Sequence, residues 1–240
     1  MVRRAVPTLI KVLVENDKED IITDICWALS YLSDGAKERI DDLLDVNLLK
    51  KMIQLLRHEN VAIAIPCLRT IGNIVTGDDN QTQMAVDCGL IDALNTIISH
   101  NKKTVRKESC WVLSNITAGT PEQVQSCIEI GIVDKLVNIL KHDDVTVKNE
   151  AVWALSNCTA SATPFQFEIF VQKGMINALG EMFKCKDVRM LAVALEGVEN
   201  ILACGQANFV NEEGDNRFAI HMEQAGCLDD LEALQAHPNH

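Results

Sequence analysis

A spacing of 42 residues recurs along this 240-residue chain and constrains its fold more than any other feature. His58, His100 and His142 lie at this spacing, and Gly89 and Gly131 keep it as well. Residue types that share one period indicate internal repeats, in which each unit buries its apolar face against its neighbours. The aligned segments are Cys26-Trp27-Ala28-Leu29-Ser30, Arg69-Thr70-Ile71-Gly72-Asn73, Cys110-Trp111-Val112-Leu113-Ser114 and Val152-Trp153-Ala154-Leu155-Ser156.

Each repeat reads as three helices. Thr120 and Pro121 predict an N-cap and the first turn of a short helix, which Gly131 ends. Apolar residues at helical spacing predict further helices over 133–140 and about 146–159. Three helices in this length are typical of the armadillo repeat. The sequence therefore predicts an all-α fold, a right-handed superhelical solenoid of about six armadillo repeats with three helices each.

The period divides the chain into units. A single armadillo-repeat domain over 1–240 is expected, with units at about 1–35, 36–77, 78–119, 120–162, 163–205 and 206–240. The first unit lacks its opening helix, which predicts that the chain starts inside a repeat of a longer protein. The last unit is an irregular cap, in which Leu228, Leu231 and Leu234 predict a final amphipathic helix after a polar loop at 211–216.

Composition narrows the choice of partners and compartments. The formal net charge of −12 argues against nucleic acid and anionic membrane as main partners, because both need clustered Lys and Arg. The start, Met1-Val2-Arg3-Arg4, shows no signal peptide, and no apolar stretch reaches the ~20 residues of a membrane-spanning helix. Nine Cys without paired spacing favour buried thiols in a reducing compartment. A cytosolic or nuclear protein is expected.

One position of the third helix departs from the character of a core. We call it the tryptophan column; a second column, mostly asparagine, follows four residues later and shares its helical face. Arg69 and Glu196 replace tryptophan in the first column, and a closed apolar core does not accept unpaired charges. We therefore predict that this face is exposed. The columns are Trp27, Arg69, Trp111, Trp153 and Glu196, then Tyr31, Asn73, Asn115, Asn157 and Asn200.

The two columns suit an extended basic peptide. Asn amides bind the N–H and C=O groups of a peptide backbone, while Trp rings hold Lys or Arg stems between them. Glu108 and Glu150 precede Trp111 and Trp153 by three residues, which places each carboxylate on its Trp face. A single Glu of this kind is usually a solvated helix charge, but two copies in register favour binding. The strongest cationic pockets are therefore expected in the units at 78–119 and 120–162.

At these residues the sequence resembles the importin-α (karyopherin-α) family, specifically its C-terminal armadillo-repeat portion. The resemblance implies an adaptor of cytoplasm and nucleus that binds nuclear localisation signals in a minor groove, with an export receptor at the C-terminal repeats. It implies importin-β binding only through a basic N-terminal segment, which is absent here together with the earlier repeats. The segments that carry it are Cys26 to Gly35, Trp111 to Gly119 and Gly226 to Gln235.

The resemblance also implies which residues line the minor groove. By position they are Arg69, Asn73, Thr76, Glu108, Trp111, Ser114, Asn115, Glu150, Trp153 and Asn157, with Val75 and Asp79 as looser contacts. Arg69 lies at the upstream edge, where it is expected to meet a carboxylate or backbone carbonyl groups at the end of the bound peptide.

Two alternatives are weighed against this interpretation. A catenin-type armadillo scaffold would hold an acidic ligand with Lys and Arg, which the Trp, Asn and Glu columns disfavour. An enzyme would need a nucleophile set, a phosphate loop or metal-ligand spacing, and the sequence has none of them. His58, His100 and His142 are too far apart to share a metal and read as cations at helix C-termini. We expect no enzyme activity, no metal and no cofactor.

Overall fold

The computed structural model describes residues 5–35 and 40–236, and within these ranges the chain is built from α-helices with short 3-10 segments. It divides into two compact units, Met1–Gly119 and Thr120–His240. No helix of the described ranges combines the length and the apolar character that crossing a membrane requires. The predicted all-α armadillo-repeat fold is confirmed.

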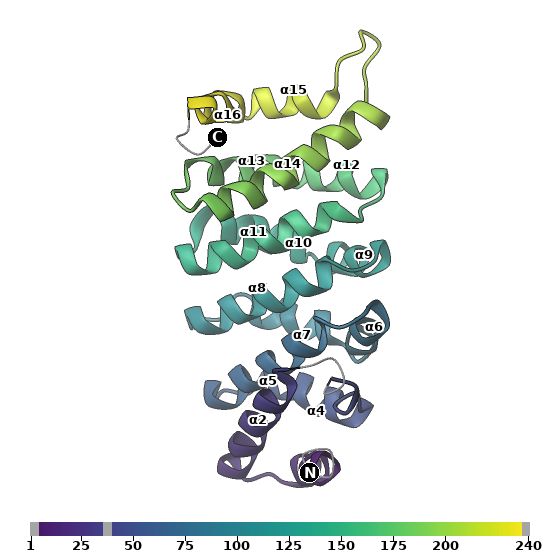
Figure 1. Ribbon diagram of the computed structural model, residues 1–240, viewed down its shortest axis with the longest axis vertical. Helices are drawn as coiled ribbons and strands as arrows, with labels where there is room; N and C mark the ends of the chain where they lie inside the picture. The colour runs from purple at the N-terminus through teal and green to yellow at the C-terminus, as the bar shows by residue number, and fades with distance from the viewer. Residues whose placement is uncertain (1–4, 36–39, 237–240) are drawn as a thin grey trace. The chain divides into compact units, whose positions relative to one another are not determined.

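In the first unit, three long helices lie side by side and carry the tryptophan column. They are α2, α5 and α8, with α5 packed between the other two (Figure 1). Shorter helices pack beneath them and complete each repeat. The helices are α1 (Val6–Glu15), α2 (Glu19–Ser33), α4 (Val46–Leu55), α5 (Val61–Ile74), α6 (Asp79–Asp87), α7 (Leu90–Ile97) and α8 (Lys103–Thr117).

The second unit repeats this arrangement, with α11 and α14 side by side (Figure 1). Its first repeat matches the predicted helices to within about two residues. The elements are α9 (Pro121–Glu129), α10 (Ile132–His142), α11 (Val145–Ala160), α12 (Pro164–Gln172), α13 (Met175–Gly180), a 3-10 segment (Glu181–Lys184), α14 (Val188–Asn208), α15 (Arg217–Gln224), α16 (Cys227–Ala233) and a last 3-10 segment (Leu234–Ala236).

The periodic glycines lie between the first and second helices of a repeat and have left-handed backbone conformations. Their φ values are 89° at Gly89, 83° at Gly131, 78° at Gly174 and 73° at Gly226. A residue with a Cβ is strained there, so glycine lets the chain end one helix and begin the next within a single residue. The predicted break at Gly131 is confirmed.

The first helices of three repeats begin with the same capping box. In each, a side chain at the N-cap accepts from the N3 backbone, and a Gln at N3 accepts from the N-cap backbone. The Gln also reaches into the preceding repeat: Gln166 Nε2 donates to the carbonyl of Pro121 at 2.8 Å and to Oε1 of Gln125 at 3.0 Å. The boxes are Asp78/Gln81, Thr120/Gln123 and Thr163/Gln166, and all three Gln side chains are buried.

The columns that the sequence assigns to the core are buried. Leu29, Ile71, Leu113 and Leu155 are each 0% exposed, and Val198 is 3% exposed. These residues pack the third helices against their neighbours. Six of the nine Cys are buried, as the apolar pattern predicts. Between α2 and α5 the thiols of Cys26 and Cys67 lie 3.4 Å apart, and burial raises the pKa of Cys67.

The C-terminal repeat is irregular, as expected. After α14 the polar loop closes with an isolated bridge between Val210 and Asn216, and the rings of Phe209 and Phe218 stack at 4.7 Å. The predicted final helix is α16, but its apolar face differs from the expectation. Cys227 is buried, Leu228 is 38% exposed, and Leu231 and Leu234 are half-buried.

We predict that Gln166→Ala destabilises the protein by about 2 kcal/mol, because it removes a buried side chain and leaves the part-buried N–H of Thr163 and carbonyl of Pro121 without their partners. Urea unfolding followed by circular dichroism measures this loss. Gln172→Ala, an exposed change at the end of the same helix, is the control and should stay within about 0.5 kcal/mol of the parent. Equal stabilities for the two variants would contradict a linking role for Gln166.

Candidate peptide-binding surface

The tryptophan column is not part of the core in either unit. Trp27 and Trp111 are half-buried, and the side chain of Arg69 is 49% exposed. In the second unit Trp153 is 40% exposed and Glu196 is exposed. The leucine position two residues after each Trp is buried, so the third helix turns one face inward and this face outward. The predicted exposure is confirmed at Arg69, Trp153 and Glu196, whereas Trp27 and Trp111 are only partly exposed.

Gly72 sets the position of Trp111. A Cβ built on Gly72 would overlap with the indole ring of Trp111, so the ring lies directly on the backbone of α5. The Asn115 side chain, one turn further along α8, donates through Nδ2 to the carbonyl of Gly72 at 3.3 Å. Both side chains of α8 are therefore held by the same point of the preceding third helix.

The asparagine column is oriented in the same way in both units. Asn73 Nδ2 donates to Ser33 Oγ at 3.0 Å, and Asn200 Nδ2 donates to Thr159 Oγ1 at 3.0 Å. Each bond points the amide nitrogen at the preceding third helix. An amide has a second N–H and an acceptor oxygen, which is the donor and acceptor set that an extended peptide backbone requires.

Arg69 connects the aromatic and acidic residues of the first unit. Its guanidinium carbon lies 5.9 Å from the ring centre of Trp27, and its Nη2 lies 3.9 Å from Oε1 of Glu108. The Tyr31 ring lies 5.9 Å from Trp27 at an interplanar angle of 31°. Arg69 thus meets a carboxylate of its own chain, at Glu108.

Three of the sequence-derived site residues offer less side chain than their pattern suggests. The Val75 side chain is 2% exposed, so its backbone is the part that a ligand can reach. Ser114 is 6% exposed, and its hydroxyl donates to the carbonyl of Trp111 at 2.8 Å. The exposed Thr76 donates its hydroxyl to the carbonyl of Asn73 at 2.7 Å. Periodicity identifies their positions but not these local bonds.

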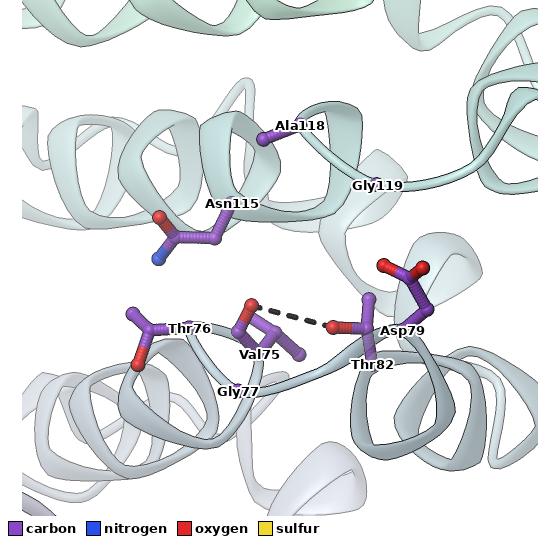
Figure 2. A pocket seen from close by; sticks show the side chains of 8 residues that line it. All are labelled: Val75, Thr76, Gly77, Asp79, Thr82, Asn115, Ala118 and Gly119. Atoms are coloured by element: carbon purple, nitrogen blue, oxygen red, sulfur yellow. Dashed lines mark hydrogen bonds between the residues drawn. The ribbon is translucent and has the colours of Figure 1, made fainter. Parts of the chain in front are cut away.

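A pocket of about 190 Å³ lies where the end of α5 meets α6 and α8 (Figure 2). Thr82 Oγ1 donates to the carbonyl of Val75 at 3.3 Å, and Asp79 stands on the same helix as Thr82. Figure 2 shows the Asn115 amide directed toward the turn at Thr76. The pocket is lined by Val75, Thr76, Gly77, Asp79, Thr82, Asn115, Ala118 and Gly119.

Four of these lining residues were predicted from the sequence and four were not. Val75, Thr76, Asp79 and Asn115 belong to the predicted set. Thr82 lies one helical turn after Asp79 on the first helix of its repeat, and this spacing is the signal that points to it. The remaining lining residues are Gly77, Ala118 and Gly119, which contribute backbone or a methyl group and carry no sequence signal of binding.

In the second unit Glu150, Trp153 and Asn157 follow one another along α11 at spacings of three and four residues. Glu150 and Asn157 are half-buried, and both interact with other parts of the protein. Their spacing puts the three side chains on one face of the helix. The second unit thus carries on one helix the same Glu, Trp and Asn set that α8 carries in the first.

A larger, mostly apolar pocket of about 450 Å³ also lies in the second unit, between α14 and α16. The sequence did not indicate it, because its apolar residues fit the ordinary pattern of a core. Its lining residues are Leu195, Val198, Glu199, Leu202, Ala203 and Leu231.

The histidines serve the turns between helices. Nδ1 of His58 accepts from the backbone N–H of Asn60 at 3.0 Å, and Nδ1 of His100 accepts from that of Lys102 at 2.9 Å. Each imidazole thus binds the backbone of the turn that leads into the next helix, and the interpretation of the histidines as cations at helix C-termini stays a prediction. Within the described ranges, no group of three or more His, Cys, Asp or Glu side chains is placed to hold a metal ion.

Solved structures with this arrangement define the class of protein. Designed armadillo repeat proteins for modular peptide recognition match with a TM-score of 0.87 and 25% identity, over 98% of this chain and 93% of theirs. A designed armadillo repeat protein in complex with the peptide (KR)4 matches with a TM-score of 0.86 and 25% identity, over 98% and 93%. The chain is an armadillo-repeat protein.

Family models match two segments of the chain. Residues 1–34 match the Armadillo/beta-catenin-like repeat, and residues 80–231 match the SIL1/FES1/HPBP1 C-terminal domain. The second match marks a similarity of the repeats within 80–231. Curated relatives align over nearly the whole chain, including 80–231, and their alignment therefore identifies the family.

Importin subunit alpha-B of Dictyostelium discoideum is 54% identical over 239 residues, 100% of this chain and 46% of the relative. Importin subunit alpha-3 of Arabidopsis thaliana is 46% identical over 238 residues, 98% of this chain and 45% of the relative. The chain thus spans a little under half the length of these relatives. It belongs to the importin-α family, to its C-terminal armadillo-repeat portion.

We predict that Gly72→Ala displaces the Trp111 ring. Alanine favours a helix by about 0.5–1 kcal/mol, but the overlap with the indole costs about 1–3 kcal/mol, so a net loss of stability near 1 kcal/mol is expected. In a background with Trp27→Phe and Trp153→Phe, Trp111 is the only tryptophan left, and acrylamide quenching of tryptophan emission should increase. Unchanged quenching would show that Trp111 does not rest on Gly72.

Proposed function

We propose that this chain is part of a nuclear import adaptor that shuttles between cytoplasm and nucleus and binds Lys/Arg-rich nuclear localisation signals. The observation that carries the proposal is the Glu, Trp and Asn set that occurs once on α8 and once on α11. Membership of the importin-α family and the likeness to a designed armadillo protein in complex with (KR)4 support it. The protein's net charge of −12 suits a basic ligand.

On α8, each residue of the set has a chemical part. The Trp111 ring, held on Gly72, packs against the methylene stem of a Lys or Arg and presents a π face to its charge. Glu108, whose side chain is 16% exposed, supplies the opposite charge from a position where solvent screens it less. The Asn115 amide, oriented by Gly72, binds the peptide backbone between side chains. Glu150, Trp153 and Asn157 take the same parts on α11.

The pocket at the end of α5 suits the ammonium group of a lysine. It brings together oxygen acceptors of three kinds: the Val75 carbonyl, the Thr82 hydroxyl and the Asp79 carboxylate (Figure 2). An ammonium has three donors and no fixed plane, so acceptors from several directions bind it well. A guanidinium holds its five N–H groups in one plane, so it matches acceptors that lie in several directions less well.

The C-terminal repeats of the second unit are proposed to bind an export receptor or another protein partner. The apolar pocket between α14 and α16 supports this, because it leaves Leu195, Leu202 and Leu231 only half-buried in a single copy of the protein. Apolar surface of this kind is commonly buried when a protein partner binds.

A catenin-type scaffold for an acidic peptide remains the alternative. Such a ligand needs Lys and Arg along the exposed face of the third helices. In the tryptophan column Arg69 is the single cation, and its guanidinium lies near Glu108 of the same protein. The remaining side chains of the column are aromatic or acidic, which favours the basic ligand.

We predict that Glu150→Lys weakens binding of a short Lys-Lys/Arg-Arg peptide by about 2 kcal/mol, roughly thirtyfold in Kd, because repulsion replaces attraction. Trp153→Ala should weaken it through lost stacking. Isothermal titration calorimetry measures both. Glu129→Lys makes the same charge change at an exposed position of α9, and Phe165→Ala removes another exposed aromatic ring, so both serve as matched controls.

Two results would contradict the proposal. One is an unchanged Kd in both Glu150→Lys and Trp153→Ala, which would remove α11 from the binding surface. The other is tighter binding of an acidic peptide of the same length than of the basic peptide, which would favour the catenin-type alternative.

We predict that Thr82→Val weakens an all-Lys peptide about fivefold or more and an all-Arg peptide less, because the hydroxyl is an acceptor for an ammonium in the pocket. Competition titrations with the two peptides measure the ratio. Thr96→Val is the control, since Thr96 is an exposed threonine whose hydroxyl donates to a helix carbonyl. An equal loss for both peptides would show that the pocket does not select lysine.

A further inference from the structure

Arg69 occupies the place that tryptophan takes in the aligned segments around Trp27, Trp111 and Trp153, and its contacts are those of a bound ligand. The guanidinium carbon is 5.9 Å from the ring centre of Trp27, within the range of a cation–π contact. Its Nη2 is 3.9 Å from Oε1 of Glu108, which stands on the next third helix. A cation over an indole with a carboxylate nearby is the arrangement proposed above for a Lys or Arg of the ligand.

We propose that Trp27 and Glu108 form a further pocket for a basic side chain, and that Arg69 is a tethered occupant that keeps ligand cations out of it. The inference rests on the proposed function, because it assigns the same ligand chemistry to this pocket. The first unit thus holds a latent cationic pocket, and Arg69 determines at which position a bound peptide cannot place a Lys or Arg.

The aromatic wall of this pocket is complete. Trp27 is half-buried, and the exposed Tyr31 ring lies 5.9 Å from it on the following turn of α2. Glu108 has a side chain 16% exposed, so its carboxylate is held at the helix surface rather than free in solvent. Two aromatic rings and a fixed carboxylate therefore remain in place when the Arg69 side chain moves or is removed.

The occupant is held weakly enough to be exchanged. The Arg69 side chain is 49% exposed, and exposed ion pairs of this length contribute little because water and salt screen them. A core residue, by contrast, is shielded from water and cannot exchange its contacts in this way. Removing Arg69 therefore opens the pocket without disturbing the buried column of Leu29, Ile71 and Leu113.

Arg69 also leaves backbone recognition in place. Asn73, four residues further along α5, keeps its orientation through the bond to Ser33 Oγ at 3.0 Å. A peptide that crosses α5 is thus still bound through its backbone at this helix, while its side chain is rejected if it is basic. Arg69 therefore selects against a Lys or Arg at the one peptide position that lies over α5, while other positions of the peptide can still be basic.

The test compares Arg69→Gln with the parent protein in calorimetric titrations of a hexapeptide of alternating Lys and Arg. The variant removes the cation but keeps a polar side chain. Arg189→Gln makes the same charge change at a side chain that is 85% exposed and pairs with Asp187 in the second unit, so it controls for the added net negative charge. Arg69→Lys keeps a cation at the position, and thermal unfolding of each variant checks the fold.

We expect Arg69→Gln to bind the hexapeptide roughly three- to tenfold more tightly than Arg189→Gln does, the effect expected for one exposed cation over Trp beside a carboxylate. Arg69→Lys should show a smaller gain. Adding Glu108→Gln to Arg69→Gln should abolish the gain, because the carboxylate is then lost.

Binding by Arg69→Gln that is no tighter than binding by Arg189→Gln overturns the inference, even where the parent protein binds the hexapeptide and the proposed function stands. A gain that survives Glu108→Gln also overturns it, because the pocket would then lack its carboxylate. If neither the parent nor any variant binds the hexapeptide, the inference and the proposed function fail together.

Discussion

The packing of neighbouring third helices within each unit is the interaction on which the rest of the structure depends. In the first unit α5 lies between α2 and α8, and in the second α11 lies beside α14. The contact buries Leu29, Ile71, Leu113 and Leu155 completely. Because an α-helix has 3.6 residues per turn, a residue two positions earlier points well away from that contact. Burial of these four residues therefore determines that the tryptophan column, two positions earlier on each helix, faces outward.

The same packing also orients the polar side chains of the outward face. Asn73, Asn115 and Asn200 each donate from Nδ2 to an oxygen of the preceding third helix. Neither the amide nor the Trp111 ring on Gly72 is free to rotate as an isolated surface side chain is. A surface ordered before it meets a ligand loses less conformational entropy on binding. The packing of the repeats thus contributes to affinity indirectly, because it orders outward-facing side chains that are not part of the core.

Much of the fold and of the exposed face could be predicted from the sequence, because equivalent positions of the repeats can be compared with one another. A residue such as Arg69 in a tryptophan column shows that the position is not core, and the left-handed glycines and the helix bounds follow from local chemistry. Periodicity places a side chain on its own helix but does not say which neighbour it meets. The buried Ser114 hydroxyl, the pocket formed with Thr82 and the accepting Nδ1 of His58 all depend on such neighbours.

The exceptions to the repeat carry more information about specificity than its regular positions do. Regular positions must satisfy packing in every unit, so they vary little in chemistry. Arg69 satisfies no packing requirement of the core, and instead sets its guanidinium over Trp27 and near Glu108. A protein that uses Trp and Glu to bind cations must also prevent them from binding its own Arg and Lys side chains, or make use of that contact. Here Arg69 fills the cation pocket at one position of the tryptophan column. A bound peptide can then place its Lys and Arg side chains only at the other positions, which fixes how it aligns with the surface.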